Sequence, residues 1–256
     1  MRLFVTAILL LTACSTPKVT TSTTHSLEAI QESQERRTAR FDNLVGGGVI
    51  EFTWTDDKGT HHEQGELDFW KQGDSISLRI SKLGELIAWF GGSGTEIWFF
   101  DLMGDEPTLT LGGEQGMFND IEIALTLLGL NSLPRGEKTM SDGVVQVVDN
   151  QQRTWNATYD ESGNRPLQIE FNDESHNAIA VHRKGIRVEI EDLHELHWPE
   201  TGGLIDLQDN QGNTEIKISF SFLSTIVKDE PMDRVMSLEY LQRSLKPTKI
   251  LQGSRQ

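Results

Sequence analysis

The sequence offers few residues whose types and spacing are typical of metal binding. His194 and His197 stand three residues apart. That spacing places two histidines on one face of a helix but on opposite faces of a strand, and it differs from the His-Glu-x-x-His pattern of zinc proteases. We therefore interpret His194 and His197 as surface residues, and we interpret the two consecutive histidines His61 and His62 in the same way. We expect no metal site.

Motifs for covalent catalysis are also missing from the sequence. It contains neither the Gly-x-Ser-x-Gly turn that exposes a nucleophilic serine nor a glycine-rich phosphate loop. The 39 acidic residues are scattered, so a carboxylate pair for glycoside hydrolysis is neither located nor excluded. We expect a protein that is not an enzyme and that needs no cofactor.

The most specific motif surrounds Cys14, the only cysteine of the chain. Arg2 and the apolar residues 3–11 precede Ala13 and Cys14, which predicts a secretory signal peptide over residues 1–13 that is too short to span a bilayer. The pattern resembles the bacterial lipobox, in which the cysteine thiol receives diacylglycerol and becomes the mature N-terminus. The alternative is an ordinary signal peptide with a chance cysteine.

The lipobox divides the rest of the chain into an anchor and a domain. Residues 14–25 become the lipidated Cys14 and a threonine-rich polar tether, and residues 26–256 become the folded domain. Residue 15 is Ser and not Asp, which by resemblance to the sorting rule of Gram-negative lipoproteins favours transport to the outer membrane. We expect a lipid-anchored outer-membrane protein that faces the periplasm.

The charge of the chain limits its partners. With 23 basic and 39 acidic residues, the formal net charge is −16. Contacts with phosphate need clustered Lys and Arg, and the sequence has no basic stripe, so we expect no nucleic-acid partner.

Residues 82–102 carry the clearest structural pattern. Two apolar runs, 86–90 and 97–100, flank the turn residues 91–94, which are Gly-Gly-Ser-Gly. Glycine-rich turns between β-branched and aromatic runs predict a β-hairpin. A strand with one wet face should alternate apolar and polar residues. Since neither arm alternates, we expect apolar contacts on both faces of the hairpin.

The remaining patterns predict a mainly β, α+β domain: one strongly curved antiparallel sheet of about eleven strands, an unclosed half-barrel with helices over its concave side. Ser26 is a candidate N-cap for a first helix, and Asn119 is the expected N-cap of a second helix that stops at Gly129. Gly46–Gly48 is expected to form a break in the chain before the first strand. Besides the hairpin, strands are expected at 49–55, 66–72, 75–81, 144–148, 153–159, 167–171, 178–182, 186–191 and 212–222, and a closing helix or arm at 232–245.

A set of apolar residues in these elements is a candidate lining for a lipid cavity, because a lipid tail needs apolar walls with few polar groups. The alternative is an ordinary core filled by side chains. The helix that ends at Gly129 is apolar nearly all round and is the expected cover of the hairpin. The candidate set is Phe52, Trp54, Phe69, Leu78, Ile80, Trp89, Trp98 and Phe100, with Leu125 and Leu128 from this helix.

The order of lipobox, first helix, meander and inserted apolar helix resembles the LolA/LolB-like family of outer-membrane lipoprotein carriers and related lipid-carrying lipoproteins. The pattern from Lys82 to Asp101, with Gly84, Gly94 and Trp98, is similar to a motif of lipidated LolA-like proteins, and the segment 232–241 is similar to their closing segment. The resemblance covers roughly residues 26–245.

This resemblance implies an unclosed barrel that holds acyl chains of a lipid or lipoprotein beneath helices, without covalent chemistry. It also implies an Arg that latches the helical lid, which no motif locates in this sequence. We therefore expect an acyl-binding protein of the outer membrane, a carrier or acceptor of lipids or lipoproteins. The alternative is a module on the same fold that binds an envelope protein partner and no lipid, and a hydrolase is a distant third hypothesis.

Overall fold

The computed structural model describes most of the chain beyond the predicted tether. The described residues are 25–57, 59–94, 96–104, 106–112, 120–174, 176–191, 199–209, 214–228 and 231–252. The predicted signal peptide at 1–13, Cys14, the predicted tether up to residue 24, the expected cap Asn119 and the histidines His194 and His197 lie outside them. None of the helices in these residues is both long enough and apolar enough to cross a membrane.

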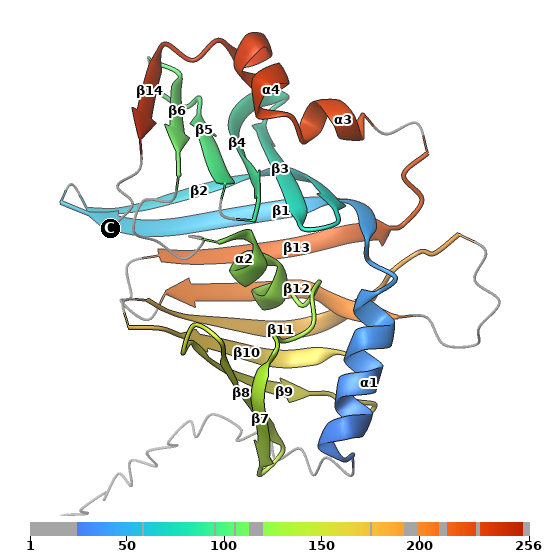
Figure 1. Cartoon of the computed structure of the whole chain (residues 1–256). Coiled ribbons are helices and arrows are strands. Elements are labelled where there is room, and N and C mark those ends of the chain that lie inside the picture. Colours follow the sequence, from blue (N-terminus) through green and yellow to red (C-terminus); the bar gives the residue numbers. More distant parts are fainter. Residues whose placement is uncertain are drawn as a thin grey trace, which may run out of the picture.

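Within the described residues, fourteen strands form one sheet in the order β14-β6-β5-β4-β3-β2-β1-β13-β12-β11-β10-β9-β8-β7 (Figure 1). Two meanders, β1 to β6 and β7 to β13, join where β1 pairs with β13. Every pair is antiparallel except β14 with β6. The strands are β1 (Asn43–Asp56), β2 (Gly59–Gln72), β3 (Ser75–Lys82), β4 (Glu85–Ser93), β5 (Glu96–Asp101), β6 (Thr108–Leu111), β7 (Gly136–Ser141), β8 (Val144–Asp149), β9 (Thr154–Tyr159), β10 (Pro166–Asn172), β11 (Asn177–Arg187), β12 (Glu200–Asp209), β13 (Thr214–Ser224) and β14 (Lys249–Gln252).

The single curled sheet is therefore confirmed, but the expected number of about eleven strands is too low. The strands β6, β7, β12 and β14 were missed, because they are short, mostly polar or interrupted by glycines. In addition, the expected strands at 178–182 and 186–191 are not separate, since β11 runs continuously to Arg187.

Four helices accompany the sheet in the described residues. They are α1 (Leu27–Thr38), α2 (Ile121–Leu127), α3 (Met232–Val235) and α4 (Leu238–Leu245). Ser26 caps α1 as expected, because its side chain accepts a hydrogen bond from the Ala29 amide. The N-cap of α2 is Asp120, whose side chain accepts from the Glu122 amide, and not the neighbouring Asn119.

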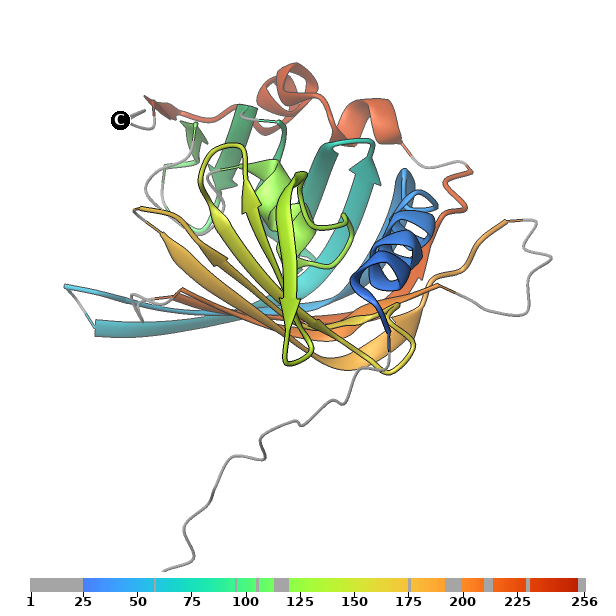
Figure 2. The same cartoon turned by 60° about the horizontal axis from the view of Figure 1, so that its bottom comes forward.

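The helices cover both faces of the sheet, not only its concave side. Figure 2 shows α2 inside the curl, while α3 and α4 lie outside it. In β3 the neighbours Ser77 and Leu78 point to opposite sides. Ser77 donates a hydrogen bond of 2.8 Å to the Val235 carbonyl at the end of α3, whereas Leu78 lies in the core that contains α2. The expectation that all helices cover the concave side is thus wrong for α3 and α4.

The glycines 46–48 lie inside β1 instead of preceding it. They lie against β13 at close range: a Cβ atom on Gly46 would lie 2.6 Å from Leu223 Cδ2, one on Gly47 would lie 2.7 Å from Phe222 Cε1, and one on Gly48 would meet the backbone of Ser219. The register between β1 and β13 also shifts between Gly47 and Gly48. Glycine here permits a close approach of two strands, so it does not mark a turn.

Candidate functional site

An apolar cavity of about 220 Å³ lies between α2 and the inner face of the sheet. All of its lining side chains are apolar, and they come from β1, β3, β4, β5, β13 and α2. The lining residues are Ile50, Phe52, Ile76, Leu78, Ile80, Phe90, Phe99, Ala124, Leu128, Ile216 and Ile218. An apolar cavity of about 150 Å³ is known to stay dry and to bind benzene, so this space is large enough for part of a hydrocarbon chain.

Four of the ten candidate residues line this cavity, namely Phe52, Leu78, Ile80 and Leu128. Phe69 and Leu125 are fully buried in the same core but do not line the space. Trp54 also lies outside the lining and stacks on His61, with ring centroids 5.0 Å apart.

Trp89, Trp98 and Phe100 lie on the opposite face of the hairpin, in the core formed with α3 and α4. The expectation that they share a cavity with Leu78 therefore conflicts with the structure. The reason is the alternation of side chains along a strand. In β4, Trp89 packs outward and its neighbour Phe90 lines the cavity.

The inner residues of the hairpin, Phe90 and Phe99, were not among the candidates. Both arms have apolar residues on both faces, so their pattern gives no preference for one set over the other. Ile216 and Ile218 of β13 were also missed as lining residues, although their alternation with polar residues did predict a half-buried strand.

The helix α2 covers the cavity and connects two distant edges of the sheet. It lies in the connection between β6, next to one edge, and β7, the strand at the other edge. All of its residues except Glu122 are buried. Gly129, with a φ of +69°, ends the helix as expected.

Three side chains donate hydrogen bonds to the carbonyl groups at the C-terminal end of α2. Arg37 Nη1 of α1 lies 2.6 Å from the Gly129 oxygen, His182 Nε2 of β11 lies 2.9 Å from the Leu127 oxygen, and Thr201 Oγ1 of β12 lies 3.2 Å from the Gly129 oxygen. A helix leaves its last carbonyl groups without partners in the helix. These donors therefore anchor the cover at its C-terminal end.

Arg37 is a buried cation, and no motif in the sequence located it. It is 3% exposed, and burial lowers its pKa to about 10, so it stays charged at neutral pH. Its second guanidinium nitrogen donates to Gln34 Oε1 at 2.8 Å, and the guanidinium carbon lies 5.3 Å from the centre of the Phe41 ring. Its charge faces the end of a helix where the helix dipole favours cations.

The N-terminal end of α2 is held by charges. Arg153, which directly precedes β9, lies 3.7 Å from Asp120 Oδ2 and 3.5 Å from Glu122 Oε2, and it donates to Asp149 Oδ2 at 2.6 Å. Burial alone would raise the pKa of Asp149, but the hydrogen bonds from Arg153 and Trp155 hold that pKa below its ordinary value. The cover is thus fixed by polar contacts at both ends and lies over apolar side chains in its middle.

His182 must be neutral to hold this position. Burial lowers its pKa to about 3, and the nearby charges of Arg37 and Arg165 contribute to this shift, against the bond to Leu127. Since a carbonyl only accepts, the proton of neutral His182 is on Nε2. The unfolded chain binds a proton at His182 near pH 6.5 whereas the folded chain does not, so this group destabilises the fold as the pH falls from about 6.5 towards 3.

We predict that His182→Gln flattens the pH dependence of stability, because the glutamine amide keeps a donor for Leu127 but does not titrate. Between pH 6 and 4, urea unfolding of the wild type should lose about 1.4 kcal/mol per pH unit more than the variant does. His62→Gln, at an exposed position, is the matched control. Equal slopes for the wild type and the His182 variant would contradict the prediction.

We predict that Arg37→Met loosens α2 at its C-terminal end, because Gly129 and Gln34 then lose a charged donor. The free energy of unfolding should fall by about 2–3 kcal/mol, and amide hydrogen exchange of Leu125 and Leu128 should become faster. The control is Arg36→Met, one residue earlier on the same helix, where the guanidinium is exposed. Unchanged exchange in α2 would show that Arg37 does not anchor the cover.

Comparison with known proteins finds relatives in structure only. No family model and no curated protein matches the sequence. A LolA superfamily protein from Nitrosomonas europaea has 14% identity and a TM-score of 0.50, over 84% of this chain and 98% of that one. A protein from Vibrio parahaemolyticus, described as an outer membrane lipoprotein-sorting protein domain, has 13% identity and a TM-score of 0.51, over 86% and 98%.

A DUF1329 family protein from Desulfovibrio piger has 10% identity and a TM-score of 0.53, over 84% of this chain and 99% of that one. Identities this low establish the fold and nothing beyond it. The shared fold agrees with the family resemblance that residues 82–101 and 232–241 carry. The chain therefore has a LolA-like fold.

Proposed function

We propose that this protein binds acyl chains of a lipid or lipoprotein beneath α2, while Cys14 anchors it in the outer membrane on the periplasmic side. The observation that carries the proposal is the cavity of about 220 Å³ with an entirely apolar lining. Two neighbours in structure support it by their descriptions, one as a LolA superfamily protein and one as a lipoprotein-sorting domain. The binding involves no covalent chemistry.

The size of the cavity implies that α2 moves when a long chain binds. Sites for drug-sized ligands measure about 300–1,000 Å³, more than the space of about 220 Å³ present here. A longer chain therefore needs the space that α2 fills. Phe99, which is 36% exposed and lines the cavity, offers a point of entry.

The energies of opening and binding are of similar size. Each methylene that leaves water contributes about 0.8 kcal/mol, so six buried methylenes contribute about 5 kcal/mol. Hydrogen bonds from charged donors contribute about 1.5–3 kcal/mol each, and neutral ones about 1 kcal/mol. The bonds from Arg37, His182 and Thr201 are thus strong enough to keep an empty site closed and weak enough for a chain to displace. Arg37 takes the role of the latch that the family resemblance implies.

We predict that a fatty acid carrying a nitroxide on its chain broadens the NMR signals of isoleucine methyl groups in the cavity. The isoleucines are well placed for this test, because five of them line the site and others lie elsewhere. Signals from the cavity should broaden much more strongly than those of the buried Ile169 and the exposed Ile250. The cavity set is Ile50, Ile76, Ile80, Ile216 and Ile218.

Ala124→Leu supplies the matching loss of binding, since the larger side chain fills part of the cavity. Displacing two methylenes of the ligand, at about 0.8 kcal/mol each, weakens binding about tenfold or more. Ala29→Leu makes the same exchange at an exposed position of α1 and should leave the affinity unchanged. If no methyl signal broadens, the cavity is an ordinary gap in a filled core, and crosslinking of a single protein partner in cells would then favour the interaction-module hypothesis.

We predict that cells fed an alkyne fatty acid label the wild-type protein and that Cys14→Ser abolishes this label. The labelled protein should separate with the outer membrane on fractionation, because two or three acyl chains hold far more firmly than one. An unlabelled wild-type protein would refute the lipid anchor at Cys14. The acyl-binding proposal would then still be tested by the NMR experiment on the isoleucine methyl groups.

A further inference from the structure

A second cleft, of about 590 Å³ and with polar walls, lies on the other side of α2. It is lined by α1, the β2–β3 turn, the β8–β9 turn and the residues that follow α2. Glu122 faces this cleft, whereas Ala124 and Leu128 face the apolar cavity. The helix is therefore a wall shared by a polar space and an apolar one.

Two buried cations line this cleft. Arg153 is ion-paired with Asp120, Glu122 and Asp149, and the other cation is Lys71 of β2. The residue is 3% exposed, and its ammonium group donates to the Phe41 oxygen at 2.8 Å and to the Gly73 oxygen at 2.7 Å. An ammonium has three donors, and among the described residues Lys71 has no ion pair and no third acceptor. A buried charge is costly when hydrogen bonds and nearby opposite charges compensate its desolvation only in part. Burial accordingly lowers the pKa of Lys71.

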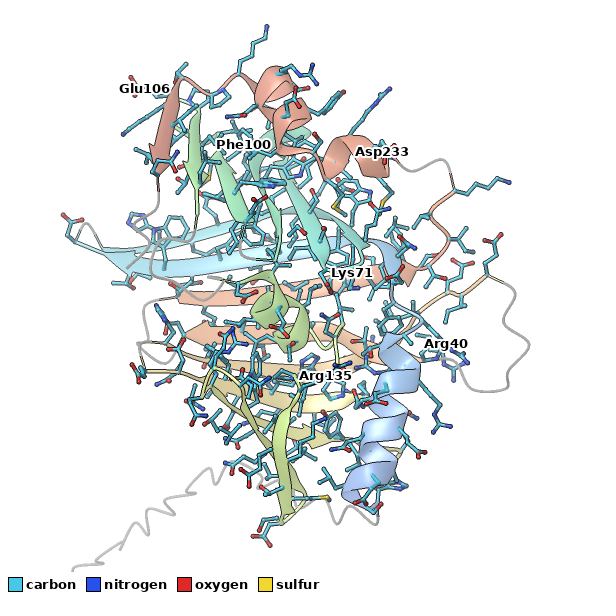
Figure 3. The ribbon with its side chains drawn as sticks, in the orientation of Figure 1. Arg40, Lys71, Phe100, Glu106, Arg135 and Asp233 are labelled. Carbon is cyan, nitrogen blue, oxygen red and sulfur yellow. The ribbon has the colours of Figure 1, made fainter. Side chains whose placement is uncertain are left out.

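The third cation of the cleft is Arg135, in the segment between α2 and β7. Its side chain is exposed, and it makes no ion pair or hydrogen bond with any described residue. Figure 3 labels Lys71 and Arg135 in the region between α2 and α1. One cation at the floor and another at the rim suit a phosphate group, whose several oxygens can accept from an ammonium and a guanidinium together.

The carboxylates that line the same cleft further restrict the kind of ligand that it can bind. Five carboxylates line it: the exposed Glu35, Asp42 and Asp74, and Glu122 and Asp149, which are both paired with Arg153. The negative charges of Asp42 and Asp74 act on Lys71 against the effect of burial, so they are close enough to repel a bare anion. A ligand that carries a positive group beside its phosphate would meet an opposite charge at both ends.

We propose that this cleft binds a phosphoethanolamine group, with its phosphate on Lys71 and Arg135 and its ammonium beside Asp42, Asp74 and Glu35. The group has two sources, a phospholipid head group or the free small molecule. The lipid source rests on the proposed function, because the chain of such a lipid would enter the cavity on the other side of α2. The binding of the head group itself does not depend on that function.

The test is an NMR titration of the protein with O-phosphoethanolamine, inorganic phosphate and ethanolamine. We expect O-phosphoethanolamine to shift the backbone amide signals of Lys71, Gly73 and Ser132, and to bind more tightly than either fragment. If none of the three compounds shifts these signals, or if phosphate alone binds as tightly as O-phosphoethanolamine, the proposal is overturned.

Two variants identify the cations. Arg135→Gln changes an exposed residue that has no partner in the described structure, so it should fold normally and bind O-phosphoethanolamine about tenfold more weakly. Lys71→Met should lose the binding, and its unfolding curve reports whether it folds. Lys184→Gln removes an exposed cation of β11 that lies outside the cleft and has no ion pair among the described residues, and this variant should bind as the wild type does. Equal affinity of the Arg135 variant and the wild type would contradict the assignment.

A lysophosphatidylethanolamine below its micellar concentration distinguishes the two sources. Binding much tighter than that of O-phosphoethanolamine, weakened by both Arg135→Gln and Ala124→Leu, would assign the site to a lipid head group. Equal affinities would assign it to the free molecule. If a fatty acid binds and O-phosphoethanolamine does not, the head-group proposal is refuted and the acyl-binding proposal stands. If O-phosphoethanolamine binds and a fatty acid does not, only the acyl-binding proposal is refuted.

Discussion

The structure depends on how the C-terminal end of α2 is satisfied inside the sheet. A buried carbonyl group without a donor costs about 1–3 kcal/mol, and a helix ends in several of them. Arg37, His182 and Thr201 provide the donors, from α1, β11 and β12 respectively. One helix end therefore fixes the position of the first helix and of two strands, although these elements are far apart in the sequence.

The same arrangement explains why a cavity remains beneath α2. The polar contacts hold the helix at its two ends, so its middle is not drawn further into the sheet. There, Ala124 presents only a methyl group to the large side chains of the strands. A larger residue would fill the space, and an unanchored helix would settle into it. The fixed position of α2 and the small side chain of Ala124 together leave a gap that close packing would otherwise remove.

Local patterns predicted the parts of this structure that depend on neighbouring residues. The hairpin at 82–102, the cap at Ser26 and the end of α2 at Gly129 are all of this kind. The face on which Trp89 and Trp98 lie was not predictable, because both faces of the hairpin are apolar and the covering helices come much later in the chain. The parallel pairing of β14 with β6 joins residues that no local pattern relates.

The anchoring residues were harder to find than the lining ones. Arg37 lies in a helix with a weak apolar stripe, and its main partner is the carbonyl oxygen of Gly129. Every residue has such an oxygen, so no sequence pattern indicates this contact. The lining was partly predictable, since Leu78 and Ile80 follow a simple alternation, whereas the choice between Trp89 and Phe90 required knowledge of what covers each side.

The first helix also determines how mechanical force enters the domain. His25, the first described residue, lies 2.6 Å from the Glu161 oxygen through its Nε2 atom, and Gln34 donates to the Gly163 and Asn164 oxygens at 2.7 Å. These contacts clamp α1 to the β9–β10 turn ahead of Arg37. A pull on the chain before residue 25 is therefore borne by that turn, and the bond between Arg37 and α2 is shielded from tension.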